Sequence, residues 1–290
     1  MGSTRLPGKV LVKLNEEYTV LDYVINQLRF CKSIKNLIIA TTYLEQDDVI
    51  VKYAKENNLE YFRGEPLDVL DRFYKCAKEF SLETIVRMNS DAPFLDPILV
   101  DEAVNKFQEN DFDFVSNNLT RTYPIGIDTE VFSFNTLEKA WKEAKLPSER
   151  EHVTPFMKKN NKIFKIYNLE NSKKIPIYRL TIDRREDLQF LKKIATNIKK
   201  KPILMNDIYQ LFTQKPDILE LYNDKTNLTE GYNKSLKEDE EFLKKTSDEE
   251  LKKHSRSFKE DIKKRYYERR RLNFLILQLG MKKKKPLLGH

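Results

Sequence analysis

Cysteine, histidine and glycine are all scarce in this chain of 290 residues. Its two cysteines, Cys31 and Cys76, cannot build a disulfide framework or a cysteine-rich zinc site, which favours a reducing compartment. Its three histidines cannot supply a compact multi-histidine metal site, so a metal here would be bound by carboxylates, as hard ions such as Mg²⁺ are. Only seven glycines stand beside 17 Phe and 14 Tyr, which argues against a collagenous or linker-like chain.

Long apolar runs are also missing. No stretch approaches the roughly 20 residues that a membrane-spanning helix needs, and no secretory leader is visible. Apolar residues make up 40% and charged residues 34%, enough for a sizeable core under a charged surface. We therefore expect a soluble, cytoplasmic protein without a membrane span.

The net charge of +8 is unevenly spread. Residues 251–290 carry 14 Lys and Arg against three acidic residues, whereas the first 250 carry 39 basic and 42 acidic residues. A nucleic-acid-binding protein usually has its basic residues on the folded domain. The near-neutral body therefore predicts no nucleic-acid partner.

Strand-like and helix-like patterns alternate through the first 200 residues. Short apolar, β-branched runs occupy residues 36–42, 83–89 and 113–117, and 130–134, 163–169 and 178–182 are less clear candidates. Between them, apolar residues recur at helical spacing, which predicts an α/β fold with a mostly parallel sheet. After residue 200 the pattern becomes helical, at 205–212, 235–243 and in a charged run from 246 to 271. We divide the chain into a domain of residues 1–200 and a helical, basic extension of residues 201–290.

The opening segment, GSTRLPGK at residues 2–9, combines glycines, hydroxyls and two cations. Backbone amides of such a loop, with Arg5 and Lys9, suit a triphosphate. The glycine spacing is not that of a Walker P-loop, and an ordinary surface turn is the alternative.

Two aspartates end predicted strands. Asp91 follows the strand at 83–89, and Asp183 follows the strand at 178–182. Open α/β sheets bind ligands at the carboxyl ends of their strands, where two carboxylates could share one Mg²⁺. The alternative is that each aspartate only caps a helix or forms a turn.

Six ordered motifs lie between residues 2 and 200. They are GSTRLPGKV at 2–10, FRGEPLDVLDRFY at 62–74, VRMNSDAP at 86–93, YPIGIDTEVFS at 123–133, LPSEREHVTP at 146–155 and LTIDRREDL at 180–188. Together these motifs resemble those of the sugar cytidylyltransferases. A shorter match covers 227–236. Within these enzymes, the chain is similar to the branch that is named for spore coat polysaccharide synthesis. That branch is related to the acylneuraminate and 3-deoxy-octulosonate cytidylyltransferases.

The resemblance implies a Rossmann-like nucleotide-diphospho-sugar transferase fold and a Mg²⁺-dependent nucleotidyltransferase. Such an enzyme would couple CTP to an acidic sugar or sugar phosphate for surface glycan synthesis and release pyrophosphate. Alternatives are a guanylyl- or uridylyltransferase of the same fold, or an inactive relative that acts as a binding module. A homodimer is possible.

The resemblance also assigns roles to individual residues. The residues expected to act in catalysis are Arg5, Lys9, Asp91 and Asp183, the two aspartates as the Mg²⁺ ligands. Those expected to bind the nucleotide are Ser3, Thr4, Arg5, Lys9, Arg63, Asp68 and Arg87. Those expected to face the sugar are Asp128, Glu130, Arg150, Glu151 and His152.

This chain also departs from these relatives. The relatives place a hydrophobic strand before the loop, so we expect the centre of the sheet to lack its first strand, with its neighbours unpaired. The tail has no counterpart that we recognise, and its apolar stretch 272–279 lies between basic runs. We favour a helix that docks this stretch onto the domain or another subunit; a membrane-surface role and a disordered end are the alternatives.

Overall fold

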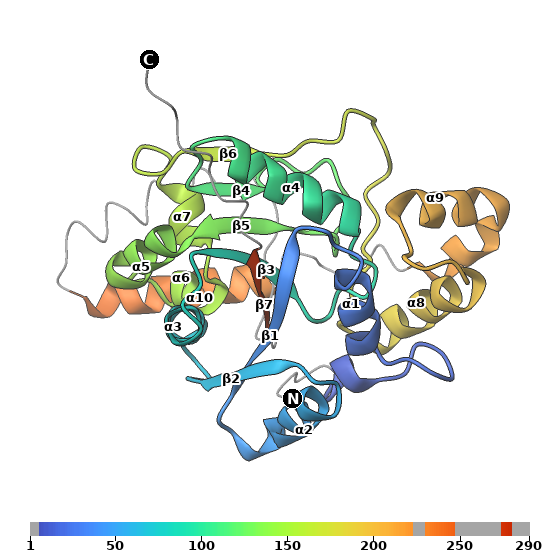
Figure 1. Cartoon of the computed structure of the whole chain (residues 1–290), viewed down its shortest axis with the longest axis horizontal. Helices are drawn as coiled ribbons and strands as arrows, with labels where there is room; N and C mark the ends of the chain where they lie inside the picture. Colours follow the sequence, from blue (N-terminus) through green and yellow to red (C-terminus); the bar gives the residue numbers. More distant parts are fainter. Residues whose placement is uncertain (1–5, 223–229, 247–273, 280–290) are drawn as a thin grey trace.

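In the computed structural model, which describes residues 6–222, 230–246 and 274–279, the alternating patterns build one sheet between two layers of helices (Figure 1). The sheet has seven strands in the order β2-β1-β7-β3-β5-β4-β6. The strands are β1 (Ile34–Thr42), β2 (Glu60–Gly64), β3 (Thr84–Asn89), β4 (Phe114–Ser116), β5 (Glu130–Ser133), β6 (Ile166–Asn168) and β7 (Phe274–Leu279).

Ten α-helices lie in the described residues. They are α1 (Val20–Leu28), α2 (Asp48–Glu56), α3 (Val69–Glu79), α4 (Pro97–Glu109), α5 (Phe134–Glu143), α6 (Pro147–His152), α7 (Pro155–Lys159), α8 (Arg185–Asn197), α9 (Met205–Gln214) and α10 (Glu230–Lys245). Short 3-10 helices η1 (Lys9–Leu11), η2 (Glu45–Asp47) and η3 (Pro216–Leu221) complete them.

Strand β1 shows how the sequence produces three layers. Successive side chains of a strand point to opposite faces of the sheet. Ile38 and Ala40 therefore join one apolar cluster, under α3, α5 and α7, while Ile39 joins the other, under α1, α2 and α4. The strand reads as a continuous apolar run because both of its faces are buried.

The direction of the strands follows from their pairing. β1 pairs with β2, and β4 with β6, in parallel; β5 is antiparallel to β3 and β4, and β7 is antiparallel to β1 and β3. Five of these strands therefore share one direction. The carboxyl ends of β1, β3 and β4 lie at one edge of the sheet, together with the start of β5.

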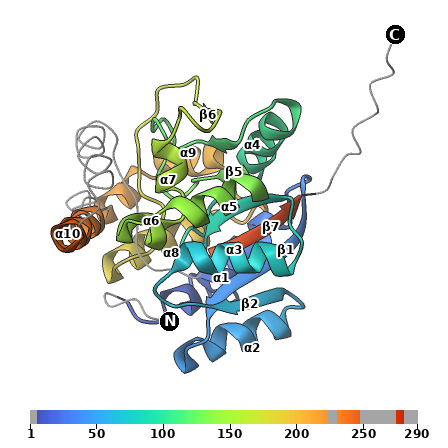
Figure 2. The same cartoon turned by 90° about the vertical axis from the view of Figure 1, so that its left-hand side faces the viewer.

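The expectation of an unpaired gap at the centre of the sheet is wrong for this structure. β7 lies between β1 and β3, with Leu277 opposite Leu37 on one side and Val86 on the other (Figures 1 and 2). The apolar stretch of the tail thus docks on the domain, as favoured, but as a strand rather than a helix. Pairing with two strands satisfies the backbone donors and acceptors that a gap would leave unpaired.

Other elements differ from the sequence patterns in smaller ways. Residues 178–182 were expected to form a strand, yet they contribute only an isolated bridge between Arg179 and Ile125. β2 was not expected, because its sequence EYFRG alternates only weakly. The charged run 246–271 lies almost wholly outside the described residues.

The helices predicted after residue 200 are present as α9 and α10. Side chains of α8 and α9 share one apolar cluster with Val20 of α1 and with Phe94, so this cluster spans residue 200. Cys31 and Cys76 are free and buried. Among the described helices, none has the length and apolar character to cross a bilayer.

Candidate functional site

The amine of Lys9 joins the two aspartates predicted to bind metal. Lys9 Nζ lies 3.1 Å from Asp91 Oδ2 and 3.4 Å from Asp183 Oδ1, and donates to the carbonyl of Ile182 at 2.8 Å. Asp91 is fully buried and Lys9 is nearly so. Three residues separated by up to 174 positions therefore meet at one point.

A buried ion pair fixes the position of Asp183. Arg179 Nη1 donates to Asp187 Oδ2 at 2.9 Å, and the second nitrogen of the guanidinium binds the other oxygen. Asp187 Oδ2 in turn accepts from the backbone amides of Asp183 and Arg184, each at 2.8 Å. Asp187 thereby caps α8 and holds the backbone of Asp183 in place.

The strand end that carries Asp91 is tied to the same segment. The amide of Ile182 donates to the carbonyl of Asp91 at 3.0 Å. Nearby, Ile125 exchanges backbone hydrogen bonds with Tyr178 and Leu180, at 2.9 and 2.7 Å. Backbone pairing thus joins the three motifs that carry Asp91, Ile125 and Asp183.

Gly126 permits this close approach. Its φ of +105° is one that L side chains rarely adopt, and a Cβ placed on it would lie 2.7 Å from Thr181 Cγ2. Only glycine fits such a backbone without strain. The residue that follows the turn, Asp128, forms an ion pair with Arg121 at 2.7 Å.

The geometry of Asp91 and Asp183 fits a hard cation. Their oxygens already converge on one positive charge, the Lys9 ammonium, in a buried position. Mg²⁺ is typically held by one or two carboxylates plus water and substrate phosphates. No group of three or more His, Cys, Asp or Glu side chains arranged for a metal occurs in the described ranges, so the rest of the coordination shell would have to come from water or substrate.

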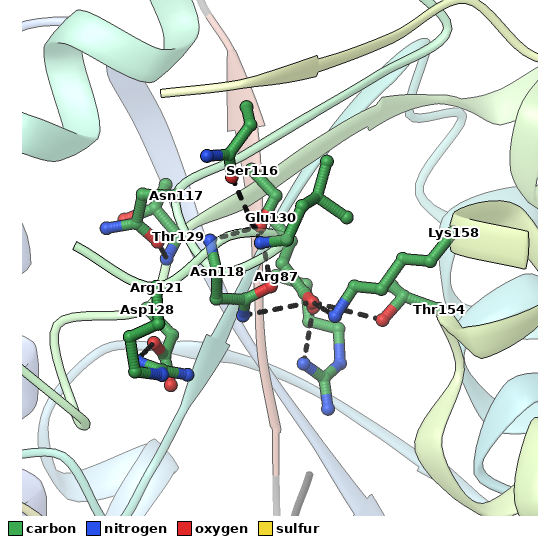
Figure 3. A network of polar contacts seen from close by, with 12 residues as sticks. Arg87, Ser116, Asn117, Asn118, Arg121, Asp128, Thr129, Glu130, Thr154 and Lys158 are labelled. Carbon is green, nitrogen blue, oxygen red and sulfur yellow. Dashed lines mark hydrogen bonds and ion pairs between the residues drawn. The ribbon is translucent and has the colours of Figure 1, made fainter. Parts of the chain in front are cut away.

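A second polar cluster surrounds Glu130 at the start of β5 (Figure 3). Glu130 accepts from Arg87 Nη1 at 2.5 Å and from Thr154 Oγ1 at 3.0 Å, and forms an ion pair with Lys158 Nζ at 2.7 Å. Asn118 Nδ2 lies 3.5 Å from the same carboxylate. The antiparallel register of β3 and β5 produces the contact, because it sets Arg87 directly opposite Glu130.

The charges around Glu130 determine its protonation. Burial by itself would raise the pKa of Glu130, but the cations Lys158 and Arg87 outweigh it and hold the pKa at about 2 instead of the ordinary 4.5. Glu130 is therefore ionised at neutral pH. It anchors two cations and a hydroxyl at the edge of the sheet where ligands bind in open α/β folds.

Comparison with known proteins identifies the family of this chain. The family model for cytidylyltransferases matches residues 1–208. The chain belongs to the cytidylyltransferase family.

Three relatives show how far the similarity extends. The uncharacterized protein MJ1063 of Methanocaldococcus jannaschii is 39% identical over 213 residues, which cover 72% of this chain and 84% of the relative. The spore coat polysaccharide biosynthesis protein SpsF of Bacillus subtilis is 32% identical over 227 residues, covering 75% and 92%. A solved cytidylyltransferase from Leptospira borgpetersenii superimposes with a TM-score of 0.73 at 33% identity, covering 78% and 94%.

In this cytidylyltransferase the other predicted site residues fall into separate contacts. Asp68 caps α3 and accepts hydrogen bonds from the guanidinium of Arg150. A residue predicted to bind the nucleotide therefore contacts one that was predicted to bind the sugar. Arg63 instead forms an ion pair with Asp48 at 2.6 Å and binds the carbonyl of Thr42. Ser3, Thr4 and Arg5 lie outside the described residues.

The three predicted sugar residues of α6 differ in burial, since Arg150 and Glu151 are half-buried and only His152 is buried. His152 is 3% exposed, and its Nε2 lies 2.9 Å from Ser235 Oγ of α10. Glu151 is half-buried in the same helix. Ser148, also in α6, binds Asp239 of α10 through its amide at 2.9 Å and through its hydroxyl at 2.6 Å. Figure 2 shows α10 alongside α6.

Several residues that contact the predicted site residues were not themselves predicted from the sequence. Lys158 and Thr154 contribute to the Glu130 cluster, and Asp187 holds Asp183. A signal existed for Asp187, which stands at the third position of a helix, where an acidic residue caps the amides before it. Lys158 gave no such signal, because its partner Glu130 lies in a distant strand.

We expect Glu130→Gln to destabilise the fold by about 3 kcal/mol at pH 7, because it leaves two buried cations without their counter-charge. The depressed pKa of Glu130 contributes stability above pH 4.5 that is lost as the pH falls towards 2. The difference in the free energy of unfolding between wild type and variant should therefore become smaller as the pH falls from 4.5 towards 2. Urea unfolding at pH 7 and at pH 3 measures this difference.

The exposed residue Glu143 is the matched control. It forms an ion pair with Lys139 on the surface of α5, so Glu143→Gln should change stability little at either pH. Equal effects of the two substitutions at pH 7 would contradict the role given to the Glu130 cluster.

Proposed function

We propose that this cytidylyltransferase uses Mg²⁺ to couple CTP to an acidic sugar or sugar phosphate, with release of pyrophosphate, in the synthesis of a surface glycan. The observation that carries the proposal is the convergence of Lys9, Asp91 and Asp183 at one buried point. The relation to the spore coat polysaccharide protein supports the glycan context.

Asp91 and Asp183 would hold the metal ion. When bound, Mg²⁺ neutralises charge on the phosphoryl oxygens and orients the triphosphate. The Lys9 ammonium, which lies between the two carboxylates, would donate to triphosphate oxygens, and Arg5 of the same loop would do so as well. Asp187 holds Asp183 in position by accepting a hydrogen bond from its backbone amide.

The reaction requires positioning rather than a covalent intermediate. An oxygen of the acceptor attacks the α-phosphorus of CTP, a P–O bond forms, and the bond to the β-phosphate oxygen breaks so that pyrophosphate leaves. Charge that builds on the phosphoryl oxygens is stabilised by cations fixed in advance. The buried cations of this site supply such fixed charge.

We assign the Glu130 cluster to the acceptor. Arg87, predicted for the nucleotide, is ion-paired to Glu130, so we place both on the acceptor side. Asp128, Arg150, Glu151 and His152 remain in the acceptor set. A cluster with cations and hydrogen-bonding groups suits a sugar that carries a carboxylate or a phosphate.

Pyrophosphate release tests the proposal. The protein is incubated with Mg²⁺, each of the four nucleoside triphosphates and a panel of acidic sugars and sugar phosphates. We expect release with CTP to exceed that with any other triphosphate by at least about tenfold, since base-specific hydrogen bonds discriminate on that scale.

Other outcomes correct or overturn the proposal. A preference for GTP or UTP would replace it with the guanylyl- or uridylyltransferase alternative. Release with none of the four would overturn the enzymatic function and leave a nucleotide-binding role. Omitting Mg²⁺ and adding a chelator should abolish release, and unchanged release would remove the metal from the proposal.

A further inference from the structure

The turn between α6 and α7 has a strained backbone. Val153 has φ 73° and ψ −55°, and the amide of Thr154 donates to the carbonyl of His152 at 2.9 Å. This is a γ-turn of the rare handedness. A β-branched residue with positive φ is an outlier, and Val153 is fully buried, so the surroundings must hold it there.

Hydrogen bonds fix both sides of this turn. On one side, Thr154 Oγ1 donates to Glu130 Oε1 at 3.0 Å, which ties the turn to the acceptor cluster. On the other, His152 Nε2 lies 2.9 Å from Ser235 Oγ, which ties it to α10. The turn is therefore the link between α10 and the carboxylate that anchors Arg87 and Lys158.

A second unfavourable feature lies beside the first. His152 Nδ1 is buried and makes no hydrogen bond to any described residue. An unsatisfied buried polar atom costs free energy, as a strained backbone does, and native structures tolerate either mostly where function requires it. Two such features at adjacent residues, inside a motif already assigned to the acceptor, indicate a functional rather than a merely structural turn.

We propose that the His152–Thr154 turn is a strained positioning element for the acceptor site, with Val153 and Ser235 as its positioning residues. The inference rests on the proposed function. Val153 sets the direction in which Thr154 meets Glu130, and Ser235 fixes the imidazole of His152 through Nε2. Neither residue is assigned a contact with the substrate.

The experiment compares Val153→Gly with Val153→Ala. Both remove the same buried side chain, but only glycine adopts positive φ without strain. We expect Val153→Gly to melt about 3 °C higher than Val153→Ala. We also expect it to show an acceptor KM about tenfold lower than that of Val153→Ala, with the KM for CTP equal in the two variants, because glycine keeps the positive φ that directs Thr154 to Glu130, whereas alanine favours leaving it.

A second pair tests α10. Ser235→Ala should raise the acceptor KM about tenfold and leave the KM for CTP unchanged, whereas Ser235→Thr keeps the hydroxyl and should restore the acceptor KM. If the KM for CTP rises as much as that for the acceptor, or if the acceptor KM is equal in Val153→Gly and Val153→Ala, the inference is wrong. An inactive wild type would instead refute the proposed function and this inference with it.

Discussion

Asp91→Asn and Asp183→Asn are each expected to lower the rate of pyrophosphate release by about a thousandfold or more. Both substitutions keep the size of the side chain and remove the negative charge that would hold Mg²⁺. Loss of a ligand that organises the transition state costs several kcal/mol, and each 1.36 kcal/mol corresponds to about tenfold in rate. Initial rates at saturating CTP and Mg²⁺ measure the effect.

A control separates this effect from general damage. Asp101 of α4 binds the backbone amides of Lys32 and Ser33, each at 2.9 Å, so Asp101→Asn also replaces a carboxylate that accepts backbone hydrogen bonds. It should keep near-normal activity. The two site variants should stay folded, with a lower melting temperature for Asp91→Asn because it removes one carboxylate partner of the buried Lys9 ammonium. Rates within tenfold of wild type for both would remove the two aspartates from the metal site.

Leu277→Pro is expected to lower the melting temperature by about 5 °C or more. β7 pairs with β1 on one side and β3 on the other, so its backbone amides belong to the centre of the sheet. Proline has no N–H to donate and is confined to edge strands and bulges. The substitution should therefore separate β1 from β3, which a thermal melt followed by circular dichroism will detect.

Leu277→Val provides the matched control, since valine keeps the amide and favours strands. It should melt within a few degrees of wild type. A melting temperature that is the same for the proline and valine variants would show that β7 is dispensable for the sheet. The same melts performed with CTP would show whether nucleotide binding depends on β7.

Local patterns in the sequence were sufficient to predict much of the sheet. The apolar runs at 36–42 and 83–89 become β1 and β3 because both faces of a central strand are buried, which leaves an uninterrupted apolar signal. The α/β architecture follows from their alternation with helical stretches. Asp91 was placed correctly after the carboxyl end of a strand, although both neighbours of that strand, β5 and β7, are antiparallel to it.

The stretch at 272–279 shows where local pattern fails. Its apolar residues fit a helix as well as a strand, and short apolar runs do not distinguish the two. Its pairing depends on β1 and β3, which lie about 190 to 240 residues earlier in the chain. Only the tertiary structure supplies two partner strands, and their backbone donors and acceptors select the extended conformation.

The sequence by itself determined the family, through six ordered motifs, and it predicted that Lys9, Asp91 and Asp183 act together. The tertiary structure decided how the remaining charges pair. Arg87 and Glu130 are 43 residues apart and were assigned to different substrates, yet the register of β3 and β5 sets them opposite each other. Such a pairing depends on which strands are neighbours and in what register, and no local pattern of residues encodes either.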